Sequence, residues 1–242
     1  MKVISIEGYI LSSINYKESS KILNILTKEY GIIGVISKSC KTPKSKLKNV
    51  SENFTYAVFH MYYNEKGLST LIGADPINYF LNIRKDILKV SYLSYLSELT
   101  KEVYKESNDK EIYDLFISGI LKIEEGFDPL IITNILELKY LYYVGVGINL
   151  DECVVCGRKS ILTFSCYKGG YVCSFCKTNE KIYDEKVLKM LKLYYYVDIN
   201  KISDIKISEK VTNEVNNILT EYYNHFTGFY LKSKKFLETL KK

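Results

Sequence analysis

The sequence has few arginines and few histidines, and each shortage narrows what the chain can do. Only two of its 34 basic residues are arginines, Arg84 and Arg158. The chain therefore has few of the fork-shaped side chains that read guanine edges with paired hydrogen bonds. The only histidines, His60 and His225, lie in no ligand-like or triad-like context, and we expect both to be packing or surface residues.

Long apolar runs are also missing. Charged and polar residues interrupt every apolar stretch before the roughly 18 residues that a membrane-spanning helix needs. Glu7 falls inside the first apolar stretch and no small-residue cleavage site follows, so the N-terminus does not read as a signal peptide. We therefore expect no membrane segment and a cytoplasmic location. No P-loop, GxGxxG or GxSxG motif occurs, which leaves an enzyme possible only with an unrecognised site.

The composition is that of an ordinary globular protein. Apolar residues make up 47% of the 242 residues and charged residues 26%, and this length suits one or two domains. The net charge of +6 permits a polyanionic partner without requiring one. An AT-rich coding bias would produce the same excess of lysine, isoleucine, asparagine and tyrosine.

Residues 1–78 have the alternation and turn spacing of β-structure. Five strands are predicted, at 3–13, 21–27, 31–37, 54–63 and 67–74. This number suits an OB-fold barrel, although an SH3-like barrel would also accommodate it. Gly31 is expected to supply backbone freedom in a tight connection between the second and third strands.

From about residue 80 the apolar spacing becomes helical, which predicts an all-α domain over 79–242 after the barrel domain at 1–78. Asp128 as N-cap and Pro129 at the first helical position predict the start of the third helix. Further helices are predicted at about 184–195, 208–225 and 229–240. The stripe that defines the first long helix consists of Ile83, Ile87, Val90, Leu93, Leu96 and Leu99.

Four cysteines form a C-x2-C-x16-C-x2-C pattern, which predicts a zinc module at about 150–180. Each pair is a tight knuckle that points two sulfurs at one ion, and four thiolates complete the tetrahedral sphere that zinc prefers. Such a site leaves no open position for an activated water, so one structural Zn²⁺ is expected. Disulfides or free core thiols are the alternative. The predicted ligands are Cys153, Cys156, Cys173 and Cys176, with Cys166 a spare strand residue and Cys40 an unpaired thiol.

The strongest cluster of charge is a lysine-rich segment between the third and fourth predicted strands, with five lysines in eleven residues and no acid among them. Its self-repulsion predicts a mobile loop that orders on an anion, and a phosphate-binding loop would let the lysines follow a phosphate backbone without reading bases. A solvated loop without function is the alternative. Tyr16 and the neighbouring Lys17 are further candidates, since an aromatic face can stack on a base. The predicted DNA-binding lysines of the loop are Lys38, Lys41, Lys44, Lys46 and Lys48.

Several segments also carry a resemblance through their order and spacing. They are Gly8–Ser19, Leu26–Gly31, Lys44–Leu47, Ser94–Leu99, Glu137–Gly145, the cysteine knuckles with Gly169 and Gly170, and His225 with Leu231–Leu237. Together they resemble, nearly end to end, the zinc-containing members of the bacterial RecO family of DNA recombination and repair proteins. Arginines common in that family's basic segments are lysines in this sequence, so phosphate binding should survive while bidentate contacts weaken.

The resemblance implies an N-terminal OB-fold, a helical C-terminal domain and an inserted zinc module. It also implies a protein of the nucleoid that binds single- and double-stranded DNA, anneals complementary strands, and works with RecR to help RecA displace single-strand-binding protein. Such a protein is not an enzyme. A nucleic-acid-processing enzyme built on an OB-fold and a zinc ribbon, and an adaptor that binds only protein, remain alternatives.

Overall fold

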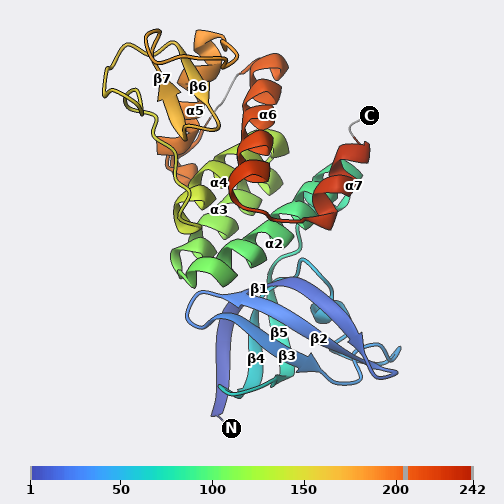
Figure 1. The fold of residues 1–242 in the computed structure, drawn as a ribbon. Helices are drawn as coiled ribbons and strands as arrows, with labels where there is room; N and C mark the ends of the chain where they lie inside the picture. The colour runs from blue at the N-terminus through green and yellow to red at the C-terminus, as the bar shows by residue number, and fades with distance from the viewer. Residues whose placement is uncertain (1, 204–206, 241–242) are drawn as a thin grey trace. The chain divides into compact units, whose positions relative to one another are not determined.

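The structure is a computed structural model that describes residues 2–203 and 207–240 (Figure 1). Contacts between residues divide the chain into two compact units. The first unit runs to Ile117 and also includes the C-terminal segment that begins at Leu231, and the second unit is Ser118–Tyr230. The boundary that the sequence suggests near residue 78, between a barrel domain and a helical domain, stays a prediction.

The first unit contains a five-stranded barrel, as the sequence predicts. Its strands pair in the order β1-β2-β3-β5-β4, and β4 pairs with β1 in turn. All pairs are antiparallel except β3 with β5, which are parallel and joined through only two residue pairs. This is the strand order of a Greek-key barrel with one weak seam. The strands are β1 (Lys2–Tyr16), β2 (Ser20–Thr27), β3 (Gly31–Ser37), β4 (Tyr56–Tyr63) and β5 (Ser69–Asn78).

Alternating side chains build the barrel core. Ile4 and Ile6 on β1 point inward, while Ser5 between them and Glu7 after them face outward, as the two-residue period of a strand requires. A register shift lies between Ile10 and Ser12. Residues 8–11 of the same strand are buried on both faces, because Tyr9 packs against Phe116 and Ser97 on helices of the same unit. The remaining core residues are Ile10, Leu23, Ile25, Val35, Ala57, Phe59, Met61 and Leu71.

Gly31 begins β3 in the left-handed conformation, with φ of +67°. A Cβ atom at this position would lie 1.7 Å from the hydroxyl oxygen of Tyr104, which belongs to a helix of the same unit. The predicted need for backbone freedom is confirmed, and a close contact that the sequence does not reveal adds to it.

Gly31→Ala is therefore expected to lower the free energy of unfolding of the first unit by at least about 2 kcal/mol, through backbone strain and the clash together. Urea unfolding followed by circular dichroism measures this. Gly73→Ala is the matched control, since a Cβ atom there meets nothing closer than 4.0 Å. Equal destabilisation by the two substitutions would contradict the packing described for Gly31.

Among its described residues, the first unit also contains four helices and one short 3-10 turn. Asp86 caps α2, because its carboxylate accepts hydrogen bonds from the backbone N–H groups of Leu88 and Lys89. The prediction of one continuous apolar stripe from Ile83 is wrong, because this cap separates α1 from α2 and leaves Ile87 66% exposed in the first turn. The elements are η1 (Asn49–Ser51), α1 (Leu81–Arg84), α2 (Ile87–Ser107), α3 (Glu111–Glu125), which spans the division between units, and α7 (Lys232–Leu240).

The second unit is built around α4 (Pro129–Tyr143), which is buried on most of its faces. The side chain of Asp128 accepts from the N–H of Leu130 at 2.7 Å and Pro129 is the first helical residue, so the predicted start is confirmed. Figure 1 shows α4 and α6 side by side. The other elements are β6 (Thr163–Ser165), β7 (Gly170–Val172), α5 (Glu185–Tyr196), η2 (Ile199–Lys201) and α6 (Glu209–Phe226).

Across residues 2–203 and 207–240, none of the helices combines the length and the apolar character needed to cross a membrane.

Candidate metal centre and nucleic-acid interface

The second unit brings the four predicted ligand cysteines together. Their sulfur atoms all lie within 4.8 Å of one another, and those of Cys156 and Cys173 are 3.7 Å apart. Four sulfurs placed about 2.3 Å from a central ion in a tetrahedron are separated by about 3.8 Å, so this spacing fits a four-thiolate metal site. All four cysteines are free, and a disulfide would require a far shorter separation of about 2.05 Å.

Backbone turns aim the sulfurs inward. In the first knuckle the N–H of Gly157 donates to the carbonyl of Cys153 at 2.8 Å, and the left-handed φ of +72° at Gly157 closes the turn. In the second, the carbonyl of Cys173 accepts from the N–H groups of Cys176 and Lys177 at 3.2 and 3.0 Å. The β6–β7 hairpin lies between the knuckles in the sequence and supports both of them, since the N–H of Val154 in the first knuckle donates to the carbonyl of Tyr171 and Cys173 follows β7 directly.

The same turns favour the metal-binding form of a buried thiol. Burial raises the pKa of the Cys153 thiol, but backbone hydrogen bonds from the facing knuckle and from its own outweigh burial and lower that pKa to about 6. A thiolate is the species that binds metal. The backbone hydrogen bonds of the two knuckles therefore favour the thiolate form of Cys153.

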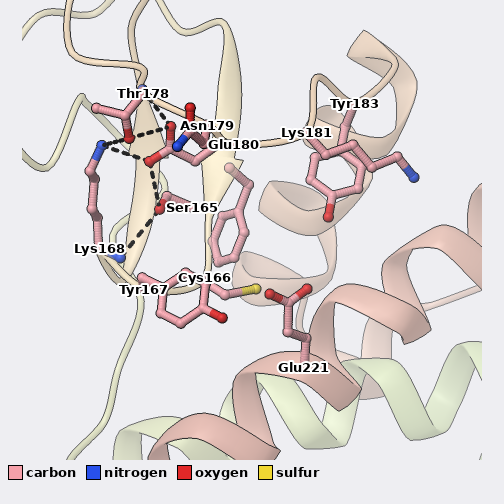
Figure 2. A pocket seen from close by; sticks show the side chains of 11 residues that line it. Ser165, Cys166, Tyr167, Lys168, Thr178, Asn179, Glu180, Lys181, Tyr183 and Glu221 are labelled. Carbon is pink, nitrogen blue, oxygen red and sulfur yellow. Dashed lines mark hydrogen bonds and ion pairs between the residues drawn. The ribbon is translucent and has the colours of Figure 1, made fainter.

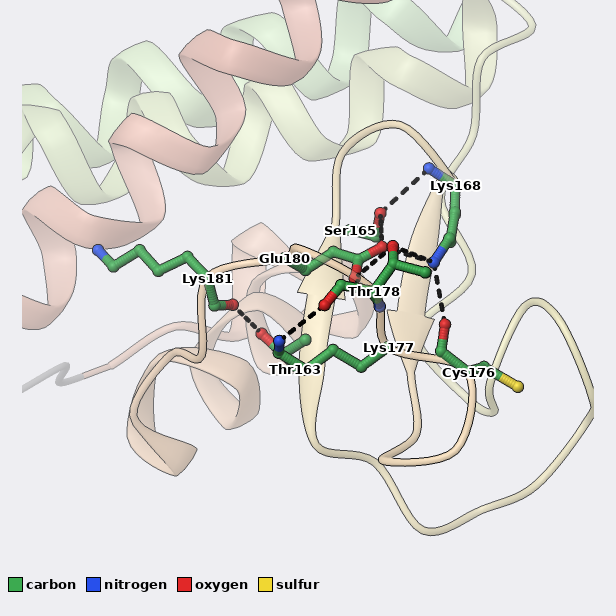
Figure 3. A network of polar contacts seen from close by, with 8 residues as sticks. All are labelled: Thr163, Ser165, Lys168, Cys176, Lys177, Thr178, Glu180 and Lys181. Carbon is green, nitrogen blue, oxygen red and sulfur yellow. Dashed lines mark hydrogen bonds and ion pairs between the residues drawn. The ribbon is translucent and has the colours of Figure 1, made fainter.

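A polar network braces the second knuckle from the side (Figure 3). The ammonium group of Lys168 lies 2.6 Å from the carboxylate of Glu180 and donates to the carbonyl of Cys176 at 3.0 Å. Glu180 also accepts from the N–H of Thr178 at 2.7 Å and from the hydroxyl of Ser165 at 3.1 Å. The Lys168 ammonium is the main cause that lowers the pKa of Glu180 to about 2. The network ties one cysteine's backbone to the hairpin.

Cys166 lies apart from the four ligands, in a cavity of about 290 Å³ (Figure 2). Its thiol faces Glu221 and lies 3.8 Å from the carbonyl oxygen of Ile218. Burial and the Glu221 carboxylate raise the pKa of this thiol to about 12, which keeps it protonated. Cys166 follows directly on β6 and does not join the cysteine cluster, in keeping with its prediction as a spare residue.

The predicted basic loop, residues 38–48, belongs to the first unit. Its five lysines are all exposed, and none forms an ion pair within the described part of the chain. Successive turns shape the backbone, with N–H groups of Thr42, Ser45 and Lys48 donating to carbonyls three residues earlier. The structure thus gives the loop a defined hydrogen-bonded path, and its predicted mobility without an anion stays a prediction.

The loop docks on the turn between β1 and β2. The N–H of Lys41 donates to the carbonyl of Ser19 at 2.9 Å, and the N–H of Ser39 donates to the hydroxyl of Ser20 at 3.1 Å. Cys40, predicted to be an unpaired thiol, is free and buried between these two contacts. These contacts anchor the basic loop to the hairpin turn. The same turn carries Tyr16 and Lys17, the two predicted DNA-binding residues outside the loop.

Tyr16 and Lys17 stand at that turn. Tyr16 is 37% exposed, and the ammonium group of Lys17 lies 5.5 Å from the centre of its ring. Lys17 has a left-handed φ of +53°, which is uncommon for residues other than glycine and asparagine. Together the hairpin turn at residues 16–20 and the loop at 38–48 form one surface, called the basic surface below.

Sequence reasoning missed one neighbour of the basic surface. A groove of about 510 Å³ lies beside the loop and is lined by Lys46, by Tyr79 and by Arg84. In the sequence, Arg84 stands out only because arginine is rare. Its position beside the loop depends on the corner between β5 and α1, and no local sequence motif predicts that corner.

The protein combines two structural modules, a Greek-key barrel with a lysine-rich loop and a separate four-thiolate module. Its sequence contains no recognised enzyme motif. The family model described as Recombination protein O N terminal matches residues 1–80, and the model Recombination protein O C terminal matches residues 84–235. The chain belongs to the RecO family of DNA repair proteins.

Relatives match the chain along nearly its whole length. The DNA repair protein RecO of Halalkalibacterium halodurans is 32% identical over 240 residues, which cover 97% of this chain and 94% of the relative. That of Listeria innocua is 31% identical over 241 residues, covering 98% and 94%. That of Bacillus pumilus is 31% identical over 248 residues, covering 99% and 96%.

Proposed function

We propose that the protein binds single- and double-stranded DNA through its basic surface and anneals complementary strands, without catalysing a reaction. The observation that carries this proposal is the uncompensated charge of the loop, whose five lysines are exposed and unpaired in the described chain. Membership of a DNA repair family supports DNA as the polyanion. A DNA partner would place its site of action at the nucleoid.

Annealing requires little more than charge neutralisation and proximity. Lysine ammonium groups hold phosphates as point charges, and such contacts position a strand without reading its sequence. Neutralising the phosphates of two strands on one surface removes their mutual repulsion and lets complementary bases meet. The proposed activity is therefore independent of sequence and needs no nucleotide cofactor.

The family resemblance supports the remaining partners. We propose that the protein works with RecR to help RecA displace single-strand-binding protein from DNA, and that helices outside the barrel provide the protein-binding surfaces. Binding measurements with the purified proteins test each of these interactions directly.

We further propose that Cys153, Cys156, Cys173 and Cys176 hold one structural Zn²⁺. The sulfur spacing fits the ion, and four thiolates leave no position at which water could be activated. When bound, zinc would supply structural cross-linking of the two knuckles. The chain's own contribution is the pair of turns and the network of Lys168 and Glu180 that orient the ligands.

Mixing the purified protein with two complementary oligonucleotides and following duplex formation tests the function. Faster joining with intact DNA and without added nucleotide is expected. Cleavage or chemical change of the DNA would instead identify an enzyme, and an absence of DNA binding would leave an adaptor that binds only protein.

Lys168→Met is expected to weaken metal retention, because the second knuckle loses the donor that fixes the Cys176 carbonyl. Loss of a group that orients a ligand commonly costs about 10-fold or more in metal affinity. Transfer of zinc to a coloured chelator should accelerate by a similar factor. Lys159→Met is the control, since Lys159 is exposed and lies between the knuckles outside this network. Identical release from both variants would show that the network does not support the site.

A further inference from the structure

The groove beside the basic loop has the size of a small-ligand site. Its volume of about 510 Å³ falls within the range of about 300–1,000 Å³ usual for ligand pockets. One wall comes from the loop and η1, through Lys46 and Asn49, and the other from the corner between β5 and α1. Lys46 thus belongs both to the basic surface and to the groove.

Arg84 carries an uncompensated positive charge into this groove. Its guanidinium donates to three backbone carbonyls, those of Tyr79 at 2.9 Å and of Asn53 and Phe54 at 3.3 Å each. No carboxylate pairs with it among the described residues. The single carboxylate that lines the groove, Glu52, is engaged by Lys21 at 2.8 Å. A fixed cation without a counter-ion favours an anionic ligand.

The groove also offers apolar surface. Tyr79 is 63% exposed and Leu81 59% exposed, whereas Phe80 between them is completely buried. Phe80 adopts a left-handed φ of +49°, held by a hydrogen bond of 2.7 Å from its N–H to the side chain of Asn78. This sparsely populated conformation turns the chain so that both neighbours project outward. The corner therefore holds an aromatic face open beside two cations.

We propose that this groove receives one unstacked nucleotide of a single DNA strand, with its base against Tyr79 and Leu81 and its phosphate between Arg84 and Lys46. This inference rests on the proposed function and deepens it. A base can stack on an aromatic face only when it is free of its own partners, and duplex bases are paired and stacked. The groove would thus give single strands an advantage over duplexes that lysines alone cannot provide.

Continuity with the basic surface favours a nucleic acid over an acidic peptide. Lys46 lies in the same loop as the other exposed lysines, so a strand that follows those lysines reaches the groove without crossing unpaired acidic side chains. A peptide carboxylate would use the two cations but would leave the length of the loop uncontacted.

The test compares Tyr79→Ala, Tyr79→Phe and the wild-type protein on three probes of equal length: an oligothymidylate, the same backbone made of abasic residues, and a duplex. Fluorescence anisotropy at one fixed salt concentration measures each affinity. Tyr79→Ala should bind oligothymidylate roughly tenfold more weakly, as expected for the loss of one base stack, and should bind the other two probes as the wild type does. Tyr79→Phe keeps the ring and should match the wild type on all three.

Tyr142→Ala is the matched control, because Tyr142 is also highly exposed but lies on α4 in the second unit. It should leave all three affinities unchanged. Undiminished binding of oligothymidylate by Tyr79→Ala would overturn the inference and leave the proposed function standing. Equal losses on all three probes would also overturn it, by showing that Tyr79 acts through charge or folding.

Two further outcomes separate the hypotheses. A wild-type protein that binds none of the probes would overturn the proposed function and the groove assignment together. The second outcome concerns a polyglutamate peptide. The assignment would be overturned in favour of a peptide site if this peptide bound more tightly than oligothymidylate and displaced it from the wild-type protein but not from the Arg84→Lys variant.

Discussion

A variant with alanine at the five lysines of the basic loop is expected to bind single-stranded DNA with much weaker salt dependence than the wild type. If each lysine contacts one phosphate, the log–log slope of affinity against salt falls by about 0.7 × 5 ≈ 3.5. Between 50 and 200 mM salt, the wild type should therefore lose about 100-fold more affinity than the variant. Titrations at four or five salt concentrations measure both slopes.

A matched variant shows whether position or total charge is responsible. It replaces five exposed lysines outside the basic surface, which removes the same charge from the chain: Lys66, Lys159, Lys186, Lys189 and Lys210. This variant should keep nearly the wild-type slope, because long-range attraction is largely screened at physiological salt. An unchanged slope in the loop variant, or equal changes in both, would contradict the assignment of DNA to the loop.

Cys156→Ser is expected to lose the metal and unfold the cysteine module. Structural zinc contributes about 10–16 kcal/mol of apparent binding free energy in small zinc modules, which equals or exceeds the roughly 5–15 kcal/mol that stabilises a whole domain. Metal analysis should give about one zinc per wild-type chain and a small fraction of that for the variant. Limited proteolysis should then cut within residues 150–180.

Cys166→Ser is the control for that experiment, because Cys166 is buried in the same unit but its thiol stays protonated and outside the cluster. It should retain the zinc and resist proteolysis. The barrel belongs to the other unit, so Cys156→Ser should keep the salt slope of DNA binding even where its affinity falls. A Cys156→Ser protein that stays fully folded and free of metal would overturn the structural role of the site.

Much of this architecture follows from local chemistry. Alternation of apolar residues predicts all five strands within a few residues of their ends, because one face of each strand must be buried. Asp128 with Pro129 predicts the start of α4, since a carboxylate cap and a residue without an N–H both suit a helix start. The spacing of the cysteines predicts their meeting, because each knuckle is itself a local turn.

Contacts between distant segments could not be predicted in this way. The N–H of Lys41 donates to the carbonyl of Ser19, which lies 22 positions earlier in the chain. Backbone groups carry no mark of their partners in the sequence. The left-handed turn at Phe80 is equally hidden, because packing of its ring against Tyr9 and Tyr56 offsets the backbone strain. These contacts are what assemble the basic surface and open the groove beside it.

The two parts of the candidate site thus differ in how they arise. The metal centre arises from local structure, because turns and their hydrogen bonds orient ligands that lie close in sequence. The basic surface depends on tertiary structure, because the loop becomes a defined feature only where Ser19 and Ser20 anchor it. Substitutions in the barrel core could therefore impair DNA binding without touching a single lysine.

Hydrogen–deuterium exchange with and without single-stranded DNA tests the central claim most directly, because it locates the strand on the wild-type protein. Slower exchange is expected at backbone amides of residues 38–48 and 16–20 when DNA is bound, with no change at the knuckles around residues 153–176. Protection confined to the second unit, with the loop and the hairpin turn exchanging at their free rates, would contradict the claim that DNA lies on the basic surface.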